Sequence, residues 1–87
     1  MSQHYFETIH EGEPTQVMMG WDRPFQGFFM VINKESDGDE PFWSNLIHAE
    51  VPYPQKLEPF LAVLDSLDIK MPNEIIEKIV ENKLKNF

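Results

Sequence analysis

The residues of this chain that could take part in catalysis or bind a metal are spread along the sequence without the spacing of a site. The three histidines are His4, His10 and His48, and they share no ligand spacing with one another or with nearby carboxylates. His10, Glu11 and Glu13 could form a polar cluster, although a solvated turn accounts for the same residues. The chain has no cysteine, which excludes disulfides, thiolate zinc sites and a cysteine nucleophile. We therefore predict neither a bound metal nor a cofactor.

The acidic segment 35–40, ESDGDE, has the composition of a calcium-binding loop but lacks the residue order of an EF-hand site. No serine stands in a G-x-S-x-G nucleophile elbow, and no glycine-rich loop is present to hold a phosphate. Nothing in the sequence singles out a catalytic pair among the fifteen carboxylates. We expect segment 35–40 to be a solvated hairpin tip and the protein not to be an enzyme.

One local group of residues has the chemistry of a binding surface, the segment Trp21-Asp22-Arg23-Pro24. Its arginine is the only one in the chain, and a guanidinium can pair bidentately with a carboxylate or stack on an aromatic ring. Tryptophan and arginine dominate the hot spots of protein interfaces. In the alternative interpretation, Asp22 starts a turn, Arg23 pairs locally and Trp21 belongs to the core. The full set of predicted interface residues is Trp21, Asp22, Arg23, Phe25, Phe29, Val31 and Trp43.

The charge of the chain restricts its partners. The formal net charge is -8 for 87 residues, and residues 1–68 hold twelve acidic against three basic residues. A body this acidic repels phosphate, so we do not expect direct binding to nucleic acid. It attracts basic surfaces, including those of proteins that bind nucleic acid, although the charge is also explained by solubility alone.

The sequence has no sign of export or membrane insertion. The N-terminal residues lack the basic and apolar parts of a signal peptide, and no apolar run approaches the ~20 residues that cross a bilayer. A small domain without disulfides suits a reducing compartment, so we expect a cytoplasmic protein without membrane contact.

The first half of the chain reads as β-strands. Strands are predicted over 5–10, 15–21 and 28–32, with a fourth over 41–46. Segment 28–32 is apolar at every position, which is typical of a central strand with both faces covered. The connections are too short for parallel crossovers, so the strands should form an antiparallel meander.

The last third changes to helical periodicity. One predicted helix begins near Lys56 and a second begins at Pro72, with Asp68 to Met71 between them as in a helical hairpin. The two apolar stripes are Leu57, Phe60, Leu61, Leu64 and Leu67, and then Ile75, Ile76, Ile79, Val80 and Leu84. The prediction is an α+β fold in one domain, 1–87, with a three- or four-stranded β-meander over 1–46 and a helical hairpin over 56–85 packed on one sheet face.

That arrangement leaves the second sheet face without an assigned cover. Phe29 and Val31 lie on the opposite face from Phe28, Met30 and Ile32. One set must meet the helices, and the other must meet a partner, a second subunit or water. Alternatively, flanking loops cover it with four aromatic residues, Phe25, Phe42, Trp43 and Tyr53.

The segments GWDRPFQGFFMVI, EPFWSNL and LEPFLAVLDSLDIKMPNEIIEKI together resemble a family of small uncharacterised proteins of proteobacteria, some of them on mobile elements. The shared features are a GWDRP-x-x-x-FF block, an S-N-L step and a pair of helices, and the resemblance runs from Thr15 to about Glu81. It implies a bacterial accessory role in the cytoplasm and carries over no catalytic residue.

Three functional hypotheses follow. The first is a non-enzymatic interaction module that self-associates, as a homodimer, through an uncovered sheet face or the region from Trp21 to Phe29. The second is an acidic inhibitor or nucleic-acid-mimicking decoy that binds a basic, nucleic-acid-binding protein. The third is a small enzyme or metal binder.

Overall fold

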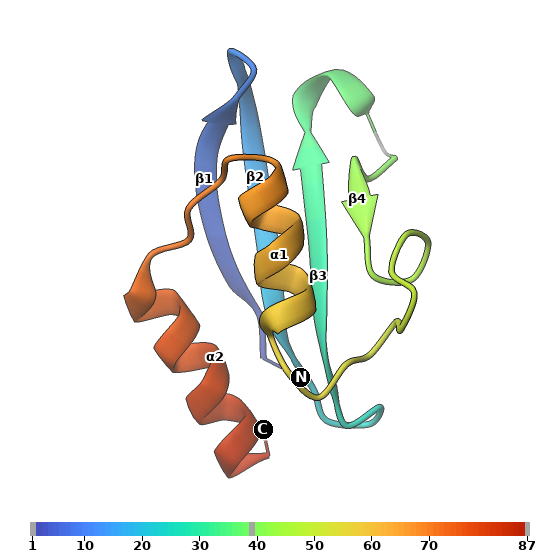
Figure 1. The fold of residues 1–87 in the computed structure, drawn as a ribbon, viewed down its shortest axis with the longest axis vertical. Coiled ribbons are helices and arrows are strands. Elements are labelled where there is room, and N and C mark those ends of the chain that lie inside the picture. The colour runs from blue at the N-terminus through green and yellow to red at the C-terminus, as the bar shows by residue number, and fades with distance from the viewer. Residues whose placement is uncertain (1, 39, 87) are drawn as a thin grey trace.

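The computed structural model describes residues 2–38 and 40–86, so Met1, Asp39 and Phe87 lie outside it. It shows an antiparallel four-stranded meander followed by two helices, which confirms the predicted α+β class (Figure 1). The elements are β1 (His4–His10), β2 (Glu13–Asp22), β3 (Gly27–Lys34), a single 3₁₀ turn η1 (Glu35–Asp37), β4 (Trp43–Ser44), α1 (Glu58–Ser66) and α2 (Asn73–Lys85). The strand order is β1-β2-β3-β4.

The core lies between the sheet and the helices. Alternate side chains of β2 and β3 point to this side and are almost completely buried. They pack with Phe60 and Leu64 of α1 and with Ile79 of α2. The strand residues concerned are Val17, Met19, Trp21, Phe28, Met30 and Ile32. The helices therefore cover the face that carries Phe28, and Phe29 and Val31 lie on the opposite face.

The β1–β2 hairpin is tighter than predicted. Its two-residue turn, Glu11-Gly12, has positive φ angles of 53° and 77°, as a type I′ turn requires. Strand β2 consequently starts at Glu13, two residues before the predicted start, and includes Pro14. Proline is tolerated there because its nitrogen points away from β1, while pairing with β3 begins only at Thr15.

The predicted fourth strand over 41–46 is reduced to two residues, Trp43 and Ser44. A turn after Ser44, closed by hydrogen bonds from the amides of Ile47 and His48 to the Ser44 carbonyl, ends it. The chain then returns to β3, where the amide of Phe28 donates to the carbonyl of Pro54 at 2.8 Å. A Cβ atom on Gly27 would lie 2.5 Å from the Tyr53 carbonyl oxygen, so this approach requires glycine.

The two helices lie apart on the sheet rather than packing as a close hairpin. Figure 1 shows α1 over the middle strands and α2 toward the β1 side, joined by a six-residue connection, 67–72. Helix α2 starts after Pro72, which is its N-cap rather than its first residue. Of its predicted stripe, Ile79 is buried, but Leu84 is 79% exposed and lies outside the core. In the described chain no helix is long and apolar enough to cross a membrane.

Candidate functional site

The tryptophan of the segment Trp21-Asp22-Arg23-Pro24 belongs to the core. Trp21 is 3% exposed, and its ring packs edge to face on Phe28 with centroids 5.1 Å apart. Its indole N–H donates to Oδ1 of Asn86, the left-handed C-cap of α2, at 3.1 Å. The structure therefore places Trp21 where the alternative interpretation put it, away from any surface that a partner can reach.

Asp22 also has a local structural role, whereas two of its neighbours are exposed. The buried Asp22 accepts the amide hydrogen of Phe25 at 3.3 Å, the bond that starts a turn. Arg23 is exposed, and no described carboxylate lies within ion-pair distance of its guanidinium, so the expected local pair is not formed. Phe25 is 65% exposed and stacks on Tyr53 at 4.5 Å with almost parallel rings.

Two of the four aromatic residues that the alternative interpretation placed over the second sheet face lie on the helix side. The rings of Trp43 and of Phe60 in α1 pack edge to face, with centroids 5.7 Å apart. The ammonium of Lys34, a buried residue, lies 4.1 Å from the centroid of the Phe42 ring. Because these contacts hold both rings against the helix-side core, the idea that they cover Phe29 is wrong, and Trp43 does not share a surface with it.

The second sheet face, here called the open face, consists of the outward side chains Tyr5, Glu7, Ile9, Gln16, Met18, Phe29, Val31 and Asn33. Phe29 is only 6% exposed, because its ring lies over Gly20 on the neighbouring strand and Ser2 lies beside that glycine. Val31 is half-buried and stands in register with Met18 and Tyr5 across three strands. Tyr5 is 52% exposed, so an apolar row without a helix over it crosses the sheet.

A shallow hollow of about 620 Å³ lies at the end of the open face near the β1–β2 turn. Its apolar wall includes Ile9 and Pro14. Glu7 and Glu35 bring exposed carboxylates to it, whereas Lys34 lines it but is buried, with its ammonium over the Phe42 ring. The accessible charge of the hollow is therefore negative.

The outer edge of β1 is free of backbone pairing in the described chain. The amide of Ser2 donates to the carbonyl of Trp21, and in an antiparallel pair every second residue bonds to the neighbouring strand. The even-numbered residues of β1 therefore make the hydrogen bonds to β2. The N–H and C=O groups of Tyr5, Glu7 and Ile9 then point outward, and their side chains are exposed on the open face. By contrast, the outer edge of β3 is paired by the segment that includes β4 and by Pro54.

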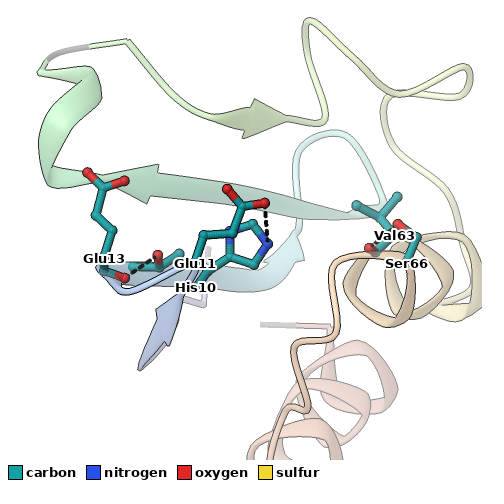
Figure 2. Close-up of polar contacts among 6 residues, drawn as sticks. His10, Glu11, Glu13, Val63 and Ser66 are labelled. Atoms are coloured by element: carbon teal, nitrogen blue, oxygen red, sulfur yellow. Dashed lines mark hydrogen bonds and ion pairs between the residues drawn. The ribbon is translucent and has the colours of Figure 1, made fainter.

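The polar cluster of His10, Glu11 and Glu13, considered above as an alternative to a solvated turn, forms only in part (Figure 2). His10 Nε2 lies 3.9 Å from a carboxylate oxygen of Glu11, while its buried Nδ1 has no hydrogen-bond partner among the described residues. Glu13 turns away and accepts the amide hydrogen of Ser36 at 2.8 Å. Hydrogen bonds from Ser36 lower the pKa of Glu13 below its usual value, and the charges of Lys34 and His10 act in the same direction.

In the described part of the chain, no serine hydroxyl is hydrogen-bonded to this histidine. Figure 2 shows the Ser66 hydroxyl bonded within its own helix, where it donates to the Val63 carbonyl at 2.6 Å. Among the described residues, no three histidine, aspartate or glutamate side chains are placed to hold a metal ion.

Searches of family models, curated proteins and solved structures give no significant match to this chain. The resemblance to small proteobacterial proteins with a GWDRP block therefore stays a prediction, and the site rests on its geometry alone.

Proposed function

We propose that this chain is a non-enzymatic interaction module that self-associates through the open face. The observation that carries the proposal is the apolar row of Tyr5, Met18 and Val31, which crosses three strands without a helix over it. A two-fold contact between two such rows buries the same residues on both subunits.

The size of the open face makes this association weak. Strands spaced about 4.8 Å apart and rising about 3.3 Å per residue give roughly 350–400 Å² for three strands of eight residues. Two faces then bury on the order of 750 Å², below the roughly 1,200 Å² of a standard stable interface. In addition, two chains of net charge -8 repel each other, so added salt should strengthen the dimer.

Analytical ultracentrifugation tests the proposal across micromolar to millimolar concentrations. The expected result is a concentration-dependent dimer that Met18→Glu abolishes, because the substitution places a charge in the middle of the apolar row. Leu84→Glu is the matched control, since it adds the same charge to a 79% exposed leucine on α2. A wild-type protein that is monomeric throughout, or equal loss of dimer in both variants, would contradict the proposal.

A second function, binding to a basic protein, is supported by the negative charge at the hollow, where Lys34 is withdrawn from the surface. The partner in this case is a basic, nucleic-acid-binding protein, and the chain would act as an acidic inhibitor or decoy that occupies its basic surface. Capture from bacterial lysate at low and at high salt tests it, because an electrostatic partner is released as salt rises. Recovery of no basic protein at low salt would contradict this function.

A further inference from the structure

We infer that the free edge of β1 binds an extended, basic segment of a partner protein, which joins the sheet as a fifth strand. The inference rests on the second proposed function, binding to a basic protein, and names the place and geometry of that contact. Addition of a peptide strand to a sheet edge is an established mode of recognition, in which backbone hydrogen bonds supply affinity and side chains supply specificity.

The backbone groups that such a strand needs are present. Three exposed residues, Tyr5, Glu7 and Ile9, each direct one N–H and one C=O away from β2, which gives six groups along the edge without a backbone partner among the described residues. An antiparallel strand would bond to all six, because each outward residue exchanges two hydrogen bonds with the residue opposite it. From Tyr5 to Ile9 the edge is about 13 Å long at about 3.3 Å per residue, so five partner residues span it.

The side chains of the same residues specify the sequence that fits. Glu7 stands between Tyr5 and Ile9 on the open face, and a residue directly opposite it on the added strand would have its Cβ about 5 Å away. A lysine or arginine at that position pairs with the carboxylate. The positions two residues to either side face Tyr5 and Ile9 and favour aromatic or β-branched side chains. The expected motif is apolar-x-basic-x-apolar.

Charge favours a basic partner over a second copy of this chain. Two β1 strands paired along their whole length about a two-fold axis would place Glu7 opposite Glu7 of the other copy, and like charges directly opposite are destabilising. A charged residue in the middle of an edge strand is also a device that prevents edge-to-edge aggregation. Glu35 lines the same hollow as Glu7, and its negative charge adds to the attraction for a cation.

The test uses capped nine-residue peptides of alternating valine and threonine with a central lysine, a valine lying two residues to either side of it. The peptide should slow hydrogen exchange of the outward amides of Tyr5, Glu7 and Ile9, measured by NMR on the full chain. N-methylation of the central lysine amide, which faces β1, should weaken binding at least about tenfold. N-methylation of the adjacent threonine amide, which faces away, is the matched control and should leave the affinity unchanged.

A charge swap provides an independent test. Glu7→Lys should reject the lysine peptide and accept the same peptide with a central glutamate, a reversal that a loss of folding cannot produce. Equal weakening by the two N-methyl groups would overturn strand addition while leaving binding to a basic partner intact. No binding of any lysine peptide at low salt would contradict both. The outward amides could also be protected from hydrogen exchange in the protein without peptide and lose that protection on dilution. This result would show that a second copy of the chain occupies the edge, and it would also overturn the inference.

Discussion

Replacing Phe28 by alanine should destabilise the protein more than replacing its neighbour Phe29, although both side chains are buried. Phe28 is 2% exposed, lies beneath the helices and packs on Trp21. Truncation of a buried phenylalanine to alanine costs about 3–5 kcal/mol, because the enclosed cavity adds to the lost transfer free energy. The edge-to-face pair with Trp21 adds about 0.5–1.5 kcal/mol, so we expect a loss of about 3.5–6.5 kcal/mol.

Phe29 has a different surrounding. Its ring covers Gly20 on the open face, where no helix lies over it. Water can enter the space that a truncated side chain leaves there, so the cavity contribution largely disappears. The remaining transfer term is about 2 kcal/mol. Phe29→Ala should therefore lower the free energy of unfolding by roughly half as much as Phe28→Ala.

Urea unfolding followed by tryptophan fluorescence and by circular dichroism measures the two losses. A domain of 87 residues has a total stability of about 4–13 kcal/mol, so Phe28→Ala could leave little folded protein. In that case the pair Phe28→Leu and Phe29→Leu gives the same comparison at smaller amplitude. A loss at Phe29 that equals or exceeds the loss at Phe28 would refute the reasoning, because it would mean that the open face is as tightly enclosed as the core.

Two further predictions concern the loop that packs against β3 and the dependence of stability on pH in the acid range. Gly27→Ala should cost about 1–3 kcal/mol, because its Cβ would lie 2.5 Å from the Tyr53 carbonyl oxygen; a urea midpoint equal to that of the wild type would contradict this. The bonds from Ser36 hold the pKa of Glu13 below its unfolded value, so their stabilisation is present above the unfolded pKa and is lost as pH falls through the folded pKa. Glu13→Gln should therefore be less stable than the wild type at neutral pH, and the difference should vanish in acid; a constant difference in unfolding free energy across the titration would disprove the assignment.

The features of the fold that follow local periodicity could be predicted from the sequence. Alternation along β2 and the uninterrupted apolar run of β3 located the core strands, and the helical stripes located Phe60, Leu64 and Ile79. Short connections required an antiparallel meander, and the structure has one. The predicted element boundaries were less accurate where backbone geometry sets them. The two-residue turn before β2, for example, makes this strand begin early enough to include Pro14.

The candidate site was harder to predict because it depends on contacts between distant residues. Trp21 and Trp43 have the composition of an interface, but Asn86 and Phe60 hold them on the helix side. The alternation of side chains along β3 predicts an exposed Phe29, yet the absence of a side chain at Gly20 leaves space for its ring there. The free edge of β1 was recoverable, since the first strand of a meander has only one neighbour, but which of its groups point outward depends on the register of the β1–β2 hairpin.

The last turns of α2 join the two ends of the chain, with consequences for the order of folding. The His4 imidazole lies 2.6 Å from Oδ1 of Asn82, across 78 positions of sequence, and the Trp21–Asn86 bond spans 65. Neighbouring strands are joined by short turns, so they can pair at a small loss of chain entropy. The contacts of α2 close long loops, and the larger entropy loss precedes the stabilising contacts. Docking of α2 should therefore be a late event that completes the hydrophobic core, and its release should require less free energy than global unfolding.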